Sequence, residues 1–406
     1  MISARTVAKT IDNVTQAPDA ALRDELLARA RRIAPIISAE AVTTESSGTL
    51  TPASVDALCE TELFWCAVPK EVGGLGCDLV TTIEILEEIT RADGSSGWSL
   101  MANAIATCLA GAYLKDKAID AMFGSGGRPI IAGMFGPGGK AREVAGGYQG
   151  SGKFGFGSGC AHSNWMGSGL MVVDDNGPRL LSNGTPEVRI CFLPRERVSF
   201  LGNWSVMGLE GTGSYDYEIP DQLVPEEFTF ERSQQVQLRG GTQFALGLAG
   251  FGCAGHAAIA LGLMRRALAE IAHISVRKKR PGTTVTVAES AVFKHDFSVH
   301  EAKFQASRGF VLEVFGSAEQ SAKKGHAMTP EQRQRFRQAA TWVHNVASEV
   351  VGFCHLWAGS NAIRHPSPLG RCTRDMNVAT QHVFVDQATL VDAAPALLER
   401  WAADYQ

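Results

Sequence analysis

The spacing of apolar and polar positions predicts helices in the first part of the chain. Between Ala20 and Glu40, apolar residues recur every three or four positions with charged residues between them, as on one buried helix face. A Gly-rich break at 71–77 precedes a second such stretch over 79–91. A third stretch, from Trp98 to about Leu114, is almost wholly apolar. We therefore expect this last helix to be buried on every side.

The pattern changes to short strands in the middle of the chain. Short apolar or alternating runs are separated there by Gly, Pro, Asn and Asp, which favour tight turns. We expect these runs to pair into a β domain. The predicted strands are Ile130–Met134, Gly147–Phe154, Leu170–Val173, Val188–Leu193 and Tyr215–Ile219.

Long helical patterns return after Gly240, and several exceed 20 residues, which is typical of an antiparallel bundle. The order helical, β, helical predicts an α+β chain of three units: residues 1–126, 127–238 and 239–406. The helices predicted in the last unit are Thr242–Ser275, Val287–Phe315, Pro330–Trp357, Pro368–Val385 and one near Leu390–Ala403.

Composition and charge exclude several classes of protein. The net charge of −4 and the scattered basic residues argue against a nucleic-acid surface. The nine cysteines form neither a CxxC pair nor a Cys/His group with zinc-like spacing. We therefore expect free thiols, no bound metal and a reducing, cytoplasmic setting. The N-terminus lacks the apolar segment of a signal peptide, and no uninterrupted apolar run reaches the ~18 residues of a membrane helix.

Four motifs occur in a fixed order along this framework: Ala92–Trp98 (ADGSSGW), Gly152–Trp165 (GKFGFGSGCAHSNW), Trp204–Ser214 (WSVMGLEGTGS) and Arg374–His382 (RDMNVATQH). Each motif alone is weakly specific. Together, in this order and spacing, they resemble the acyl-CoA dehydrogenase superfamily and especially its monooxygenase branch. The resemblance covers almost the whole chain from about residue 20.

This resemblance implies a particular architecture and cofactor. We expect an N-terminal helical domain, a central β-barrel or β-sandwich domain and a C-terminal four-helix bundle. A flavin is expected between the β domain and the bundle. The resemblance also implies a homotetramer, because this bundle usually packs against copies of itself.

The second motif is expected to meet the flavin ring. Gly157 and Gly159 let the backbone approach a flat ring closely because glycine has no Cβ atom, and Ser158 then offers its hydroxyl to the reactive edge. By composition alone the same residues suit a Gly-rich β-turn. Trp98 is expected to form a wall of the flavin and substrate pocket, although a core aromatic is the simpler alternative.

Three further residues are assigned to the cofactor by the same resemblance. Phe135 belongs to the segment FGPGG, which is similar to a flavin-edge loop of the family. Arg277 resembles an arginine that reaches a flavin phosphate, often across a subunit interface, and a permanently charged planar guanidinium suits that contact. Ser360 lies in Gly359–Ile363, a segment similar to the monooxygenase branch.

Two histidines are candidates for the chemistry. His382 is expected on the helix Pro368–Val385, where an ion pair between Arg374 and Asp375 would hold it. Its unperturbed pKa of about 6.5 suits proton donation or acceptance near neutral pH. His162 is expected to contact the substrate together with Trp98, or else to cap a strand end.

One feature favours oxygenation over dehydrogenation. Dehydrogenases of the family use a glutamate base in the bundle, but the region that we match to it, Trp357–Ile363, contains no carboxylate. An alternative base on another helix leaves the dehydrogenase open. A non-catalytic relative and the nitrogen- or sulfur-oxygenating branches remain further alternatives.

The sequence therefore predicts the oxygenase component of a two-component flavin-dependent monooxygenase. Reduced flavin, FMNH₂ or FADH₂, would come from a separate NAD(P)H-dependent reductase and react with O₂ to a C4a-hydroperoxide. Ser158 and His382 are the predicted catalytic residues, and the predicted substrate is a small aromatic molecule, phenolic or indolic. No Rossmann GxGxxG motif follows a predicted strand, which fits an enzyme that does not reduce its own flavin.

Overall fold

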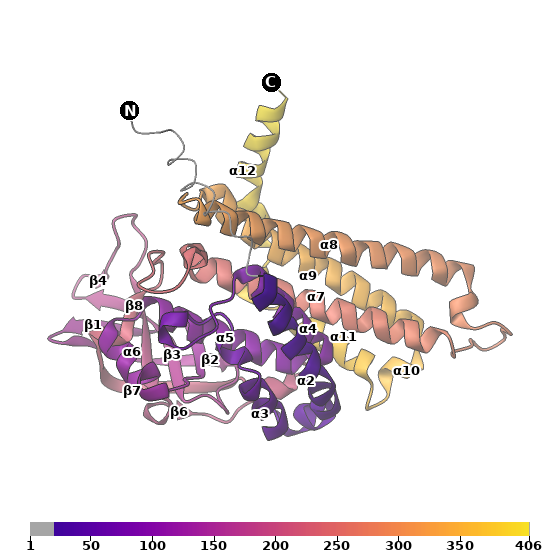
Figure 1. The fold of residues 1–406 in the computed structure, drawn as a ribbon, viewed down its shortest axis with the longest axis horizontal. Helices are drawn as coiled ribbons and strands as arrows, with labels where there is room; N and C mark the ends of the chain where they lie inside the picture. The colour runs from indigo at the N-terminus through magenta and orange to yellow at the C-terminus, as the bar shows by residue number, and fades with distance from the viewer. Residues whose placement is uncertain (1–19, 406) are drawn as a thin grey trace, which may run out of the picture.

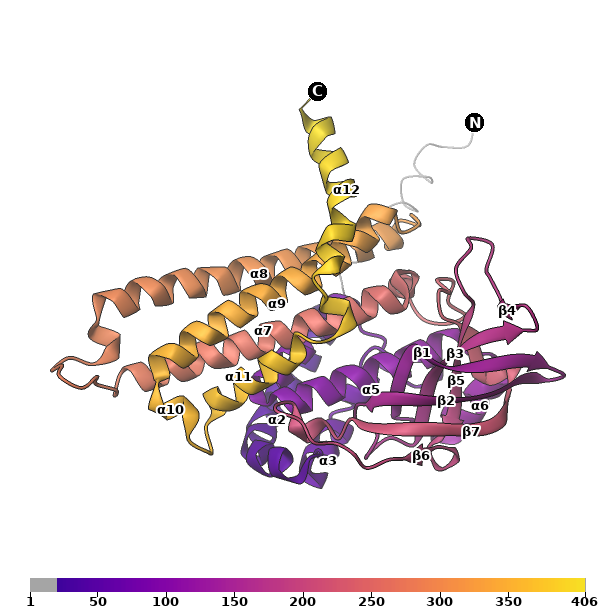
Figure 2. The same cartoon turned by 180° about the vertical axis from the view of Figure 1, so that it is seen from behind.

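The computed structural model describes residues 20–405 and has a sheet at one end and long helices at the other (Figure 1). The N-terminal helices lie between the sheet and the long helices, which both views show (Figure 2). The C-terminal helix α12 projects away from the body of the molecule. The expectation that the N-terminus carries no signal peptide concerns the first nineteen residues, which lie outside the described residues.

The N-terminal helices follow the predicted apolar periodicity. Helix α5 buries nearly all of its side chains, as its uniform apolar sequence predicts, and α4 packs against it. These helices are α2 (Ala20–Ser47), α3 (Pro52–Glu60), α4 (Leu79–Ala92), α5 (Gly94–Tyr113) and α6 (Asp116–Phe123).

The central strands form one eight-stranded sheet. Its order is β6-β7-β2-β1-β3-β5-β8, with β4 paired to β3; the β1–β3 pair is parallel and the other pairs are antiparallel. Small glycines face one another where β1 and β2 pair at Gly139 and Gly152, so these strands lie close together. The strands are β1 (Ile131–Val144), β2 (Gly147–Gly157), β3 (Trp165–Asp174), β4 (Gly177–Pro178), β5 (Val188–Pro194), β6 (Ser199–Phe200), β7 (Tyr215–Pro225) and β8 (Thr229–Glu231).

The C-terminal helices confirm the predicted bundle but not every boundary. The helix expected over Pro368–Val385 ends at Ala379, so His382 does not lie on it. The remaining chain crosses over to helix α12 through a short 3₁₀ turn, Val383–Val385. The helices are α7 (Gly247–Ser275), α8 (Ala291–Lys323), α9 (Pro330–Ala358), α10 (Ser360–Ile363), α11 (Pro368–Ala379) and α12 (Ala388–Asp404).

Helix α7 is the central helix of the bundle and packs against both α9 and α4. Within the described chain, the helical segment Thr242–Ser275 is the one that is long and apolar enough to cross a membrane by length and composition. Its most apolar window has a mean hydropathy of 1.7, and 83% of that window is buried inside the structure. Burial of this kind is what a core helix requires.

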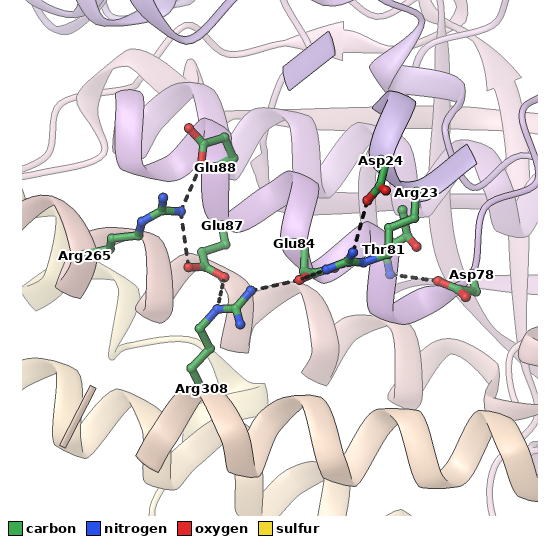
Figure 3. A network of polar contacts seen from close by, with 9 residues as sticks. All are labelled: Arg23, Asp24, Asp78, Thr81, Glu84, Glu87, Glu88, Arg265 and Arg308. Carbon is green, nitrogen blue, oxygen red and sulfur yellow. Dashed lines mark hydrogen bonds and ion pairs between the residues drawn. The ribbon is translucent and has the colours of Figure 1, made fainter. Parts of the chain in front are cut away.

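A network of charged side chains ties α4 to three other helices (Figure 3). Three carboxylates on α4 meet arginines from α2, α7 and α8. Burial raises the pKa of Glu84, but hydrogen bonds from Arg23 and Arg308 outweigh it and leave that pKa below its ordinary value. We call this set of residues the charge network. Its members are Arg23, Glu84, Glu87, Glu88, Arg265 and Arg308.

Candidate active site

A chain of hydrogen bonds joins helix α5 to the end of strand β2. The indole Nε1–H of Trp98 donates to Ser158 Oγ at 3.1 Å. Ser158 Oγ lies 2.7 Å from Ser214 Oγ, which in turn lies 2.8 Å from Thr212 Oγ1. Ser158 is 7% exposed, so its hydroxyl is held in a nearly dry setting. Two motifs predicted to meet at the flavin therefore lie together in the structure.

Trp98 is held at this place by the first turn of helix α5. The capping residue is Asp93, whose carboxylate accepts hydrogen bonds from the backbone N–H and the hydroxyl of Ser96. Ser95 and Ser96 both lie inside the helix. The cap fixes the start of the helix and thereby the direction of the indole one turn later.

The glycines around Ser158 are required by the backbone. Gly159 has a φ of +74°, and a Cβ atom there would lie 2.3 Å from Asn103 Oδ1. The Gly159 N–H donates to the carbonyl oxygen of Thr212. Gly157 pairs with Tyr215 at the start of strand β7, and a Cβ atom on Gly157 would lie 3.0 Å from the Tyr215 carbonyl oxygen. The turn is therefore both a Gly-rich β-turn and the scaffold of the serine.

His382 lies in the connection after α11, where its ring Nδ1 accepts a hydrogen bond from the backbone N–H of Phe384. An accepting Nδ1 places the proton of the neutral ring on Nε2, which is then a donor. The ring centroids of His382 and Trp98 are 6.0 Å apart. Burial, with a smaller effect of His344, lowers the pKa of His382 to about 4. At neutral pH the ring is therefore uncharged.

Two histidines that the sequence did not single out lie beside His382. The rings of His256 and His382 are 3.9 Å apart between centroids, and His256 is 4.9 Å from Trp98. His344 lies 6.4 Å from His256, and its Nδ1 pairs with the Ala340 carbonyl. We call His256, His344 and His382 the imidazole cluster. The sequence signal for His256 was its place as the single polar side chain in the apolar first part of α7, residues 247–264.

His162 follows Ser158 by four residues and is hydrogen-bonded to Asn103 of helix α5. Its Nε2 is 2.9 Å from Asn103 Oδ1, and Asn103 Nδ2–H donates to the Ile131 carbonyl, which fixes the orientation of the amide. His162 is therefore the donor in its pair, and its Nδ1 is buried without a partner. Burial lowers the pKa of His162 to about 4.

The expected ion pair between Arg374 and Asp375 is wrong. Arg374 pairs with Glu45 of α2, whereas Asp375 accepts a hydrogen bond of 2.6 Å from the backbone N–H of Leu209. Burial first, and the charge of Asp93 second, raise the pKa of Asp375 to about 7. Asp375 thus fastens α11 to the segment that leads into Thr212 and Ser214.

Phe135 lies within strand β1 and not in a loop, which corrects the expectation for the segment FGPGG. The pairing of β1 with β3 shifts register between Met134 and Gly139, so this stretch is a bulged part of the strand. The Phe135 ring packs edge-on against Phe192 and presses on Gly167, whose would-be Cβ lies 2.5 Å from it.

Arg277 and Ser360 line one basic cleft at the far end of α7. The cleft has a volume of about 950 Å³ and is also lined by Lys278, Lys279 and Arg280. His256 near the start of α7 contacts Trp98, so this cleft lies about 30 Å away along the helix. The structure therefore does not bring Arg277 and Ser360 to Ser158 within one subunit.

The residues around Ser158 fit a flavin by their donor set. Unpartnered, buried ring nitrogens occur on His162, His256 and His344, next to a hydroxyl chain that ends on an indole N–H. Flat ring systems with several acceptors and donors suit such a surface. Among residues 20–405, no group of three or more His, Cys, Asp or Glu side chains is arranged to hold a metal ion.

The fold and this site define a class of protein. The chain matches the acyl-CoA dehydrogenase N-terminal domain over residues 21–114 and the acyl-CoA dehydrogenase C-terminal domain over residues 254–387. The two matches together cover more than half of the chain. The chain belongs to the acyl-CoA dehydrogenase family, and the predicted α+β fold class is confirmed.

Within this family, the relatives and structural neighbours are flavin-dependent monooxygenases. An indole-3-acetate monooxygenase of Pseudomonas putida is 28% identical over 84% of this chain and 85% of its own. The flavin-dependent monooxygenase oxygenase subunit HsaA of Rhodococcus jostii is 30% identical over 47% of this chain and 48% of its own. The structure of XiaF from Streptomyces sp. with FADH₂ and glycerol superposes with a TM-score of 0.85, at 21% identity, covering 94% of this chain and 96% of that one.

Proposed function

We propose that this protein is the oxygenase component of a two-component monooxygenase that hydroxylates a small aromatic substrate, phenolic or indolic. The observation that carries the proposal is the hydrogen bond from Trp98 Nε1–H to Ser158 Oγ beside the neutral ring of His382. The relatives named for indole-3-acetate and for an oxygenase subunit support the same reading. FMNH₂ or FADH₂ would be supplied by a separate NAD(P)H-dependent reductase.

The flavin, when bound in its reduced form, supplies the electrons that activate O₂. The Gly157–Gly159 turn admits its ring, and Ser158 presents a hydroxyl whose orientation is set by Trp98 and Ser214. His382 holds a proton at Nε2 and offers it to an oxygen atom on the reacting edge. Its low pKa keeps the ring uncharged, so the ring does not draw water into a site that must stay dry.

The substrate contacts in this proposal are Trp98 and His162. The Nδ1 atom of His162 is buried and unpartnered, and in the tautomer fixed by Asn103 it is an acceptor. A phenol hydroxyl or an indole N–H would satisfy it. Trp98 provides a flat apolar wall, which suits an aromatic ring. Phe135 is proposed to support the flavin edge from strand β1 rather than from a mobile loop.

The basic cleft extends the proposal to the assembly. Arg277 and Ser360 lie too far from Ser158 to hold the same flavin molecule in one subunit. We therefore propose a homotetramer in which Arg277 and Ser360 of one subunit contact the phosphate of a flavin bound mainly by a neighbour. Free cysteines throughout the described chain suit the cytoplasm as the setting.

The test is rapid mixing of the whole protein with reduced flavin under anaerobic conditions, followed by oxygenated buffer. We expect a transient absorbance band that precedes the rise of oxidised flavin and that is shorter-lived in Ser158→Ala. Direct appearance of oxidised flavin, at the rate seen without protein, would contradict the proposal. Oxidised flavin that stays bound on purification and is reduced by an acyl thioester would favour a dehydrogenase instead.

A further inference from the structure

The imidazole cluster is formed because α7 lets the segment after α11 approach its surface. A Cβ atom on Gly252 would lie 2.5 Å from the ring of Phe384, so that ring rests directly on the glycine. His256 follows one helical turn later on the same face, and there it meets the ring of His382. The two imidazole planes are inclined by 30°, which makes this a face contact.

A face contact between the two imidazole rings excludes a hydrogen bond between them. Hydrogen bonds of an imidazole lie in the ring plane, so no proton passes between His256 and His382 across their faces. The Nδ1 atom of His256 has no hydrogen-bond partner, and the side chain is only 3% exposed. A buried polar ring without a structural partner costs stability, which a merely structural position would avoid by using an apolar ring.

We propose that His256 is a positioning residue that acts through His382: its ring holds the His382 imidazole against Trp98 with Nε2–H directed into the flavin site. This inference rests on the proposed function, since His382 is the proton-holding group there. Trp98 contacts both rings, at 4.9 Å for His256 and 6.0 Å for His382. The three rings form one aromatic unit to which α5, α7 and the segment after α11 each contribute one member.

The surroundings of this unit also determine its charge. The titratable groups that face His382 are His256 from α7 and His344 from α9, while α5 contributes Trp98 and the 3₁₀ turn contributes Phe384. Burial first, and then the neighbouring His382 and His344, hold the pKa of His256 well below its ordinary value. His256 is therefore uncharged when His382 titrates, and its ring acts on His382 by holding that ring in its buried place.

The experiment compares His256→Leu with His256→Phe in the full-length protein. Ring resonances of ¹⁵N-labelled histidine are followed from pH 3.5 to 8 by NMR without flavin, and reduced-flavin affinity and hydrogen peroxide release are then measured. His256→Leu removes the ring that holds His382 in its buried place. A His382 ring that moves toward solvent should have a pKa that rises from about 4 toward the unperturbed value of about 6.5. Peroxide release per flavin oxidised should increase severalfold. His256→Phe keeps a stacked ring and should retain most of the wild-type behaviour.

His300→Phe is the matched control, because His300 also stacks on an aromatic ring, Phe353, at 4.1 Å in the bundle. It should change neither the His382 titration nor peroxide release. An unchanged His382 titration in His256→Leu, or equal losses in the Leu and Phe variants, would overturn the inference. Failure of the wild-type protein to bind reduced flavin would instead overturn the proposed function, because the flavin-free titration tests the ring contact independently.

Discussion

The charge network and the imidazole cluster are both buried polar regions, yet they treat their polar atoms in opposite ways. In the charge network, Arg308 binds Glu84 and Glu87 at once, and Arg265 reaches Glu87 and Glu88 (Figure 3). In the imidazole cluster, the Nδ1 atom of His256 and the Nε2 atom of His344 have no partner. Structural polar groups are satisfied within the fold, whereas groups that serve a ligand keep atoms free for it.

The same contrast appears in protonation. Glu84 and Glu88 remain charged because arginines outweigh the cost of burial, as their lowered pKa values indicate. The histidines remain neutral because burial dominates: for His344 the hydrogen bond to the Ala340 carbonyl offsets only part of its cost, and for His382 the neighbouring His344 adds to it. One region therefore contributes stability through paired charge, and the other tolerates instability for the sake of chemistry. Four changes would break or sharpen this comparison.

The largest effect on stability is expected from Arg308→Met. It leaves the Glu84 and Glu87 carboxylates, both nearly buried, short of a partner, so we expect a loss of about 3 kcal/mol in the free energy of unfolding. Urea unfolding measures the loss. The control Arg400→Met removes a half-exposed pair with Glu331 and should change stability little. Equal losses of stability in both variants would contradict a particular stabilising role of the charge network.

His382→Ala should give the opposite pattern. Hydroxylation is expected to fall about 10²-fold, because a proton donor at the reacting edge is lost. The free energy of unfolding should fall by less than in Arg308→Met, since removal of a neutral ring leaves no unpaired charge behind. Product yield per NAD(P)H and urea unfolding are the two measurements. A large loss of stability with normal yield would assign His382 to the framework.

Gly252→Ala tests how closely the two parts of the site must approach. The new methyl group would meet the Phe384 ring at 2.5 Å, and relief of that overlap should displace the His382 segment at a cost of about 1–2 kcal/mol. Gly309→Ala is the control, because nothing lies within 4 Å of its would-be Cβ and alanine favours a helix. We expect thermal unfolding to show a lower Tm for the first variant and a slightly higher Tm for the second.

The smallest effect is expected in the contribution of Asp375 to the pH dependence of the free energy of unfolding. Its pKa of about 7 lies above the ordinary carboxyl value near 4, so the folded state binds this proton more tightly than the unfolded state. The resulting stabilisation is complete below about pH 4 and is lost as pH rises through 7. Asp375→Asn should therefore gain roughly 1 kcal/mol relative to wild type between about pH 6.2 and pH 8. Equal stability differences at both pH values would contradict the assignment.

The histidines make the free energy of unfolding depend on pH in the opposite direction, which provides an internal check. His162, His344 and His382 have pKa values near 4 in the folded state and about 6.5 when unfolded. The unfolded chain therefore binds more protons below about pH 6.5, and stability falls as pH decreases from there toward 4. Asp375→Asn removes the opposing slope over the same pH range, so the acid-side loss should be steeper in that variant.

The sequence alone determined the fold class and the region of the site. Apolar periodicity predicted the helices, short runs between turn residues predicted the sheet, and the glycines at 157 and 159 indicated a tight backbone turn around Ser158. These features depend on residues that are neighbours in the chain. Local backbone preferences and the spacing of buried side chains express them directly.

Only the tertiary structure decided which side chains meet. His256 touches His382 because the segment after α11 crosses α7 at a glycine. Arg374 pairs with Glu45 because α2 lies opposite it, and the helix before His382 ends early. Helical spacing indicates which face of α7 is buried, but it does not indicate what covers that face. Such contacts join residues more than a hundred positions apart, and their geometry is set by the packing of whole helices.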